Sequence, residues 1–260
     1  MGRMPALVVR ESSPRPPALE VAVSHALVER ASAGAVGPTL RIYRPAATLA
    51  FGRLDALRPG FAAAAAAARE HGFEPVVRAP GGHAVAYHEG CLVVDEVMPD
   101  RDPIGRLQGR FARSGERLAA ALREVGVDAR IGRIAGEFCP GDYTVSARGQ
   151  VKLVGTAQRV VRHASLLAAS IAVTGGDALR AVLTDVYRAL DLDWDPATAG
   201  AAADDVPGVR VADVERAVVR AYADWDLIEG SLDAATLARG EQLEARHLVP
   251  RADTMRTAAR

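Results

Sequence analysis

Lysine is almost absent from this chain of 260 residues. The sequence contains 32 lysine and arginine residues together, and Lys152 is the only lysine among them. Arginine presents a planar, forked guanidinium, whereas lysine presents a compact ammonium on a flexible stem, so the two are not interchangeable. A single lysine in this background either survived by chance on a solvated loop or supplies chemistry that arginine cannot. The scarcity makes Lys152 a candidate functional residue.

Cysteine is also scarce, since only Cys91 and Cys139 are present. Two cysteines are too few for a disulfide framework, so each is either a small buried hydrophobic residue or a reactive thiol. Cys91 precedes the apolar run 92–94, and we expect it to be a core residue. Cys139 lies in a loop-forming segment, and both interpretations stay open for it.

Charge of one sign is missing too, because the 32 basic residues are balanced by 32 acidic ones. A net charge of zero gives no overall field to attract nucleic acid or an anionic membrane. No apolar run is long enough to span a bilayer, and the first residues lack the apolar core of a secretory signal. Neither of the common glycine-rich nucleotide loops occurs. We therefore expect a cytoplasmic protein without a nucleic-acid or membrane partner.

The chain alternates between short apolar runs and longer amphipathic segments, which predicts an α+β fold with a mixed β-sheet flanked by helices. We expect one main domain over residues 1–190, followed by a linker and a helical C-terminal extension over residues 191–260. The predicted strands are 40–43, 48–51, 75–78, 84–87, 92–97, 129–131, 143–147, 151–154 and 166–173. The predicted helices are 18–31, 61–71, 104–125, 177–190, 211–225 and 232–247.

The segment from Arg78 to Tyr87 is the first that indicates chemistry. Arg78 ends a predicted strand and is followed by the pair Gly81 and Gly82. Glycine lets the backbone approach a ligand closely, while a fixed cation and amide groups face an anion. A glycine pair is by itself only a turn. His83 and His88, five residues apart and without an obvious third ligand, do not predict a metal site.

The second segment surrounds Lys152, which lies on a predicted strand shortly before Gly155. We expect its ammonium to project over a pocket with a floor of backbone. A compact ammonium on a flexible stem can then face a ligand that lies over this floor. Lys152 is therefore our first candidate for a catalytic group.

The order of these motifs resembles a known family. The motif Arg-x-x-Gly-Gly-x-Ala-Val from Arg78, the turn with Asp142, and Lys-x-x-Gly-Thr-Ala-Gln from Lys152 look like the catalytic domain of lipoate-protein ligase A and its octanoyltransferase relatives, in the biotin/lipoyl protein ligase superfamily. The segment 48–53 also resembles an early strand of that family that ends in Gly-Arg. The resemblance extends over residues 18–190.

This resemblance implies an enzyme that attaches lipoyl or octanoyl groups to a lysine of lipoyl domains in 2-oxoacid dehydrogenase complexes or of the glycine cleavage H protein. ATP with Mg²⁺ would form an acyl-adenylate from lipoate or octanoate. Lys152 would contact the acyl carbonyl and the phosphate, and Asp142 would orient Lys152 or a magnesium-bound phosphate. The resemblance assigns substrate and adenylate binding to Arg78, Gly81, Gly82, His83, Ala84, Tyr87, His88, Asp142, Gly155, Thr156 and Ala157.

Two alternatives stay open. In the single-domain octanoyltransferases of the superfamily, a cysteine upstream of the lysine takes the acyl chain from acyl carrier protein without ATP, and Cys139 lies about there. The ligases that use ATP carry a C-terminal accessory domain, which residues after 190 do not clearly match. The chain could also be a silent protein that binds a lipoyl-like or biotin-like ligand. Biotinylation and a DNA-reading role are disfavoured, because the Gly-Arg-Gly-Arg motif and an N-terminal DNA-binding domain are not found.

Overall fold

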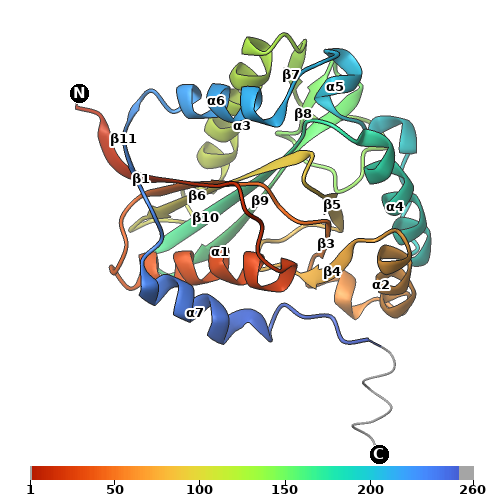
Figure 1. The fold of residues 1–260 in the computed structure, drawn as a ribbon, viewed down its shortest axis with the longest axis horizontal. Coiled ribbons are helices and arrows are strands. Elements are labelled where there is room, and N and C mark those ends of the chain that lie inside the picture. Colours follow the sequence, from red (N-terminus) through yellow and green to blue (C-terminus); the bar gives the residue numbers. More distant parts are fainter. Residues whose placement is uncertain (1, 252–260) are drawn as a thin grey trace, which may run out of the picture.

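A mixed sheet of eight strands runs through the centre of the protein, in a computed structural model that describes residues 2–251 (Figure 1). β1 pairs in parallel with β11 and with β2, and the other neighbouring strands are antiparallel. From one edge to the other, the strands are β11 (Trp225–Gly230), β1 (Met4–Glu11), β2 (Thr39–Tyr43), β6 (Cys91–Pro99), β10 (Ala164–Ala172), β9 (Val151–Val161), β8 (Val145–Ala147) and β7 (Ala129–Ile131).

A second sheet of three strands carries much of the candidate site. β3 (Thr48–Phe51) lies between β4 (Glu74–Val77), with which it is parallel, and β5 (Val85–Tyr87), with which it is antiparallel. Two helices, α2 (Phe61–Glu70) and α4 (Gly176–Ala189), share one apolar core with this sheet. The small side chains of the alanine run in α2 are part of that core, which explains a helix almost without large residues.

The remaining helices cover both faces of the larger sheet. Figure 1 shows α1 and α7 on one side of it and α3 and α6 on the other. Their bounds are α1 (Pro17–Ser32), α3 (Leu107–Glu124), α5 (Ala202–Asp205), α6 (Val211–Ala221) and α7 (Ala234–Glu244), and two short 3₁₀ turns lie at Asp55–Leu57 and Pro196–Thr198. Because both faces are covered, most side chains of the central strands are apolar on both sides, and the buried charges of Arg41 and Asp95 are exceptions.

β1 shows this double burial most clearly. Ala6 and Val8 belong to the core under α3 and α6, whereas Val9 belongs to the core under α1. Successive side chains of a strand point to opposite faces, so a continuous apolar run is what a strand in this position requires. The helix α1 is also buried on two sides. It packs against the sheet through Val23 and Leu27, and it shares a second small core with Leu243 of α7.

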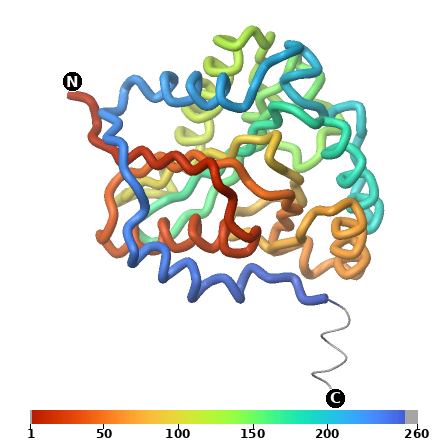
Figure 2. Tube along the Cα trace, viewed as in Figure 1, coloured from red at the N-terminus to blue at the C-terminus, as the bar shows by residue number. Residues whose placement is uncertain are grey.

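The α+β architecture is confirmed, but two strands were missed. β1 was not predicted, although its run of apolar residues is a strong strand signal. The expected helix 211–225 was too long, because α6 ends at Ala221 and the strand β11 begins at Trp225. β11 is an edge strand with an exposed face, so its acidic residues hid the strand pattern. Figure 2 shows β11 beside β1, at opposite ends of the colour scale.

We had expected a helical C-terminal extension, but this region also contains the strand β11. β11 completes the edge of the main sheet, and α7 packs on α1. The division of the chain into two domains near residue 190 stays a prediction. Residue 1 of the first predicted domain and residues 252–260 of the second lie outside the described residues. Between residues 2 and 251, no helix has the length and apolar character that crossing a membrane demands.

Candidate active site

Two hollows meet at Cys139. The deeper one lies between the two sheets, with walls from α1, β2, β5, β6, β9 and β10, and has a volume of about 610 Å³ counting its open mouth. The outer one is lined by Gly81, Gly82, Asp142 and neighbouring residues. Cys139 and Thr156 line both. A long narrow ligand in the deep pocket would therefore present one end at the Cys139 thiol.

The glycine pair is held close to the end of β3. The Arg78 N–H donates a hydrogen bond to the Phe51 carbonyl (3.0 Å), which fixes the start of the loop. A Cβ atom at Gly52 would lie 1.8 Å from the Gly82 carbonyl oxygen, so only glycine fits there. This close approach explains why glycine follows the early strand at position 52.

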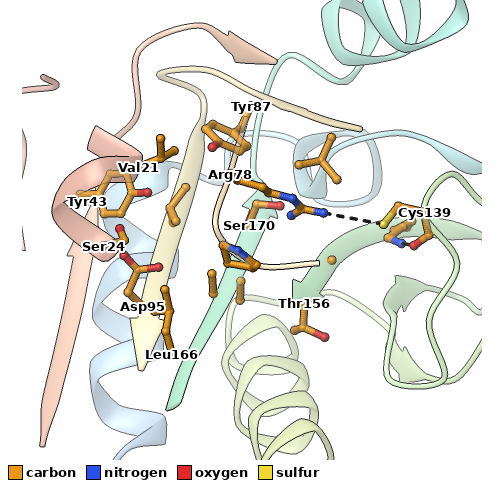
Figure 3. Close-up of a pocket in the computed structure, with 17 residues that line it drawn as sticks. Val21, Ser24, Tyr43, Arg78, Tyr87, Asp95, Cys139, Thr156, Leu166 and Ser170 are labelled. Carbon is orange, nitrogen blue, oxygen red and sulfur yellow. Dashed lines mark hydrogen bonds between the residues drawn. The ribbon is translucent and has the colours of Figure 1, made fainter. Parts of the chain in front are cut away.

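Cys139 lies directly over Gly82. Its Sγ accepts a hydrogen bond from the His83 N–H (3.2 Å), and the Arg78 Nη2 lies 4.0 Å away (Figure 3). A Cβ atom at Gly82, where φ is +91°, would lie 2.8 Å from this sulfur and 2.9 Å from the Arg78 Nη2. Gly82 thus makes room for the thiol, and an amide and a guanidinium face the sulfur.

The backbone of Cys139 is strained. Its φ is +41°, in the left-handed region that non-glycine residues rarely adopt, and such strain persists only when the surroundings enforce it. The Cys139 N–H donates to the Tyr187 hydroxyl (2.9 Å), which in turn donates to the Ala84 carbonyl (3.0 Å). Burial raises the pKa of Tyr187 well above its ordinary value, so the phenol stays neutral and can both accept and donate.

Lys152 enforces the rest of this conformation. Its side chain is only 2% exposed, and the Nζ donates to Glu137 Oε2 (2.8 Å) and to the carbonyls of Phe138 (2.9 Å) and Cys139 (2.7 Å). An ammonium has three N–H donors, so all of them are used. Lys152 thus lines the deep pocket, as expected, but its hydrogens point at the Cys139 loop.

The sequence reasoning missed Glu137, the carboxylate that pairs with Lys152. Glu137 is fully buried, and it also accepts hydrogen bonds from the Ile134 N–H (3.0 Å) and the Thr144 hydroxyl (2.6 Å). Asp142, which we expected to orient Lys152, does not contact it. The Asp142 side chain is 70% exposed and pairs with Arg133 (2.9 Å). A physical argument could have pointed to Glu137, because a buried lysine requires a buried carboxylate as its partner.

The other residues predicted from the glycine segment divide into two groups. His83 lies at the site, and its Nδ1 is 2.8 Å from Asp55 Oδ1, a carboxylate that is completely buried. Tyr87 lines the deep pocket. His88 lines neither hollow, because its ring bonds the Gly90 N–H (2.9 Å) and the Gly175 carbonyl (3.3 Å). The prediction that His88 binds substrate gains no support from this placement.

The residues predicted after Lys152 are on the same strand, β9, which is longer than we expected. Gly155 faces the deep pocket, and a Cβ atom there would touch the Lys152 Cε at 3.3 Å. Thr156 lines both hollows and Ala157 the outer one. Of these three residues, the structure therefore places Thr156 at the junction where Cys139 lies, with Gly155 and Ala157 on either side of it.

Sequence reasoning also missed the far end of the deep pocket, where Ser24 and Asp95 form part of the lining. Arg41, completely buried, donates to Glu11 Oε2 (2.7 Å) and to Glu20, and its Nη1 lies 3.5 Å from Asp95 Oδ2. Burial raises the pKa of Asp95 to about 6 against the opposing effect of Arg41. Because its residues lie on the four elements α1, β1, β2 and β6, this ionic cluster has no motif in the sequence.

The residues around Lys152 do not fit a nucleotide phosphate as they stand. A phosphate at this ammonium would have to displace Glu137 or the two carbonyl groups, and the space over Gly82 is filled by the Cys139 sulfur. In the part of the chain from residue 2 to 251, no group of three or more His, Cys, Asp and Glu side chains could hold a metal ion.

The candidate site is thus a cysteine held over a glycine loop, beside a buried lysine and at the mouth of a pocket between two sheets. The model of the lipoyl protein ligase A/B catalytic domain matches residues 16–190, and the chain belongs to this family.

Among its relatives is an octanoyl-GcvH:protein N-octanoyltransferase of Geobacillus kaustophilus, 30% identical over 162 residues, which are 62% of this chain and 57% of that one. A lipoyl-GcvH:protein N-lipoyltransferase of Listeria monocytogenes is 26% identical over 145 residues, 54% of this chain and 50% of that one. This chain thus matches only part of each relative. The bipartite lipoate protein ligase of Thermoplasma acidophilum has the same fold, with a TM-score of 0.70, 21% identity and coverage of 94% and 93% of the two chains.

Proposed function

We propose that this protein transfers an octanoyl or lipoyl group from one carrier protein to a lysine of another through a thioester on Cys139. The observation that carries this proposal is the position of the Cys139 sulfur, where the deep pocket meets the outer hollow. A chain lying in the deep pocket would place its acyl carbon beside the thiol, and an attacking lysine could enter through the outer hollow. The names of the relatives support this reaction class.

The first half of the reaction moves the acyl group to sulfur. The Cys139 thiolate attacks the acyl carbon of an acyl-lysine on the donor, the C–N bond breaks, and the proton of the thiol goes to the departing amine. In the second half, the amine of the acceptor lysine attacks the thioester, the C–S bond breaks, and the sulfur recovers a proton. One amide replaces another, so the overall exchange requires no ATP.

Arg78 is the group we assign to the oxyanion. Its Nη2 is held by the His83 carbonyl (2.9 Å) and lies 4.0 Å from the Cys139 sulfur. A guanidinium fixed beside the thiol is suited to stabilise the oxygen of the tetrahedral intermediate, because negative charge develops there. Arg78 would therefore stabilise both transition states.

His83 is the residue we assign to proton transfer. Asp55 holds its Nδ1, so the Nε2 is left to take a proton, and the side chain is 36% exposed. Its backbone amide already bonds the Cys139 sulfur. A histidine oriented by a buried carboxylate is a common general base.

Lys152 has a positioning role in this proposal. Its hydrogens hold the Phe138 and Cys139 carbonyls and thereby the left-handed turn that aims the thiol. Arginine would keep the charge but not the compact geometry that reaches three acceptors. The need for this geometry would explain why lysine is retained here.

ATP-dependent lipoate ligation is the second candidate. It is favoured by the description of the family, which names lipoyl protein ligases. An apo lipoyl domain incubated with the protein separates the two. The donors to compare, by intact mass of the acceptor, are octanoylated GcvH, octanoyl-acyl carrier protein, and free lipoate with ATP and Mg²⁺. We expect transfer from a protein donor without ATP. Transfer from lipoate and ATP alone would establish the ligase, and ligand binding without transfer would establish a silent binding protein.

A further inference from the structure

The far end of the deep pocket is polar, although the proposed octanoyl substrate ends in a methyl group. Ser24 of α1, Tyr43 of β2 and Asp95 of β6 line it. The Ser24 hydroxyl donates to Asp95 Oδ2 (2.5 Å), and the Asp95 side chain is only 1% exposed. A buried carboxylate in the wall of a pocket for alkyl chains requires a physical explanation.

The second oxygen of this carboxylate is unused by the protein. Ser24 and Arg41 both contact Oδ2, and within residues 2–251 the Oδ1 accepts no hydrogen bond. Figure 3 shows one oxygen of Asp95 beside Ser24 and the other turned toward the interior of the pocket. A ligand that fills the pocket must therefore either bond Oδ1 or bury it without a partner.

The negative charge of Asp95 is not needed to neutralise Arg41. Two guanidinium groups, Arg15 and Arg41, bond Glu11 and Glu20, and these four charges already balance. Asp95 makes the total three carboxylates to two cations, a surplus of one negative charge. Its contact with Arg41, at 3.5 Å, is also long. The surplus charge lies at the atom that faces the pocket, where a ligand can satisfy it.

We propose that this pocket selects acyl chains whose far end donates a hydrogen bond, through a hydroxyl or a thiol, over plain alkyl chains. Asp95 would be the acceptor and Ser24 would orient it. The dihydrolipoyl group, with its two thiols, belongs to this class, and the octanoyl group does not. The inference rests on the proposed function, since it assumes that the acyl chain lies in the deep pocket with its reactive end at Cys139.

The energetic basis is the unsatisfied acceptor. A methyl group against Asp95 Oδ1 would remove the oxygen from water and leave it without a donor, whereas a hydroxyl or thiol would supply one. Sites built to bond a substrate hydroxyl reject the analogue without it strongly. Because the pKa of Asp95 is about 6, the carboxylate is ionised at pH 7.5 and is an acceptor there.

Binding of neutral amides to the Cys139→Ala variant tests this preference without any reaction. Calorimetry at pH 7.5 would compare the N-methyl amides of octanoic, 8-hydroxyoctanoic and dihydrolipoic acids, so that the hydroxyl and the thiols are separate arms. We expect at least one of the two polar amides to bind about tenfold tighter than octanoyl amide, or more. Adding Asp95→Leu should reduce that ratio to about one.

Ser170→Ala is the matched control, because it removes another hydroxyl of the same pocket, one that Figure 3 shows closer to Arg78. It should leave the ratio unchanged. If Asp95→Leu does not fold, as judged by its melting curve, Asp95→Ala replaces it, because alanine also removes both acceptor oxygens.

Equal or tighter binding of octanoyl amide to the Cys139→Ala protein overturns the inference, and so does a preference that survives removal of the Asp95 carboxylate in whichever of the two variants folds. The proposed function has a separate readout, acylation of Cys139 in the wild-type protein. Acylation without a preference contradicts only the inference, whereas a preference without acylation contradicts only the transfer reaction. If no amide binds and no acylation occurs, both fail.

Discussion

The deep pocket has a buried cation near each end, and the two are used differently. At the mouth, Lys152 gives all three of its hydrogens to Glu137 and to two carbonyls of the Cys139 loop. At the far end, Arg41 and Arg15 together balance Glu11 and Glu20, and the neighbouring Asp95 keeps an oxygen toward the pocket. A closed network fixes the position of a reactive atom, while an open one leaves a group for the ligand.

This difference predicts that substitutions at the mouth abolish chemistry, whereas those at the far end alter stability and selectivity. The largest effect should come from Cys139→Ala, because the proposed thioester cannot form without the sulfur. We expect transfer to a lipoyl domain to fall by at least about a thousandfold with an unchanged melting curve. Cys91→Ala is the matched control, since Cys91 is buried in the core, and it should retain transfer. Equal losses in the two variants would contradict the nucleophile assignment.

Breaking the ion pair at the mouth should cost both stability and activity. Lys152→Met leaves Glu137 buried without a cation, which typically costs about 3–5 kcal/mol of unfolding free energy. The double variant Lys152→Met/Glu137→Gln should recover much of that stability but none of the transfer, because the Cys139 loop is still not held. Denaturant titration and a transfer assay measure the two effects. Recovery of transfer in the double variant would show that Lys152 does not position the thiol.

Lys152→Arg sharpens the same point, because it keeps the charge. We expect the variant to fold and to lose transfer, since a guanidinium cannot reach three acceptors placed around one nitrogen. Undiminished acylation of a lipoyl domain by this variant would mean that charge alone suffices.

Gly82→Ala should displace the thiol by steric contact. The added Cβ would lie 2.8 Å from the Cys139 sulfur, and φ at this position is +91°. We expect a loss of about 1–2 kcal/mol in stability from the backbone and a larger loss in the rate of Cys139 acylation. Gly81→Ala provides the control, because nothing lies within 4 Å of its added Cβ. Similar acylation rates in both variants would contradict the packing of the thiol against Gly82.

The smallest effect concerns the far end and its dependence on pH. The pKa of Asp95 is raised from 3.8 to about 6 in the folded protein, so the ionised carboxylate destabilises the fold above pH 6. As pH falls from 6 to 4, the folded state takes up the proton first and this destabilisation disappears. Asp95→Asn should therefore raise the melting temperature at pH 8 by several degrees and change it little near pH 4.5. A lower melting temperature at pH 8 would contradict this assignment.

Sequence reasoning found the mouth of the pocket because its chemistry lies in two contiguous motifs. Arg78, Gly82 and Lys152 were predicted, and the structure brings them together around Cys139. Asp142 was assigned a contact with Lys152 from the family resemblance, but Glu137 makes that contact, because the folded turn buries Glu137 and leaves Asp142 exposed.

The far end could not be predicted in this way. Ser24, Arg41 and Asp95 lie on three separate elements, and only the packing of α1 over β2 and β6 brings them together. β11 was missed for a similar reason, since an edge strand that pairs with the first strand of the chain has no local signal as clear as a buried run. Local sequence motifs therefore do not predict contacts between residues that are distant in the sequence.

The measurement that tests the central claim most directly is the intact mass of the wild-type protein after mixing with octanoylated GcvH, without ATP and without an acceptor. We predict a mass increase of one octanoyl group, located on Cys139 by peptide mapping, reversed by hydroxylamine and lost on addition of an apo lipoyl domain that becomes octanoylated. The account would be contradicted if no acyl group appears on the wild-type protein and the Cys139→Ala variant octanoylates the acceptor as fast as the wild-type protein does.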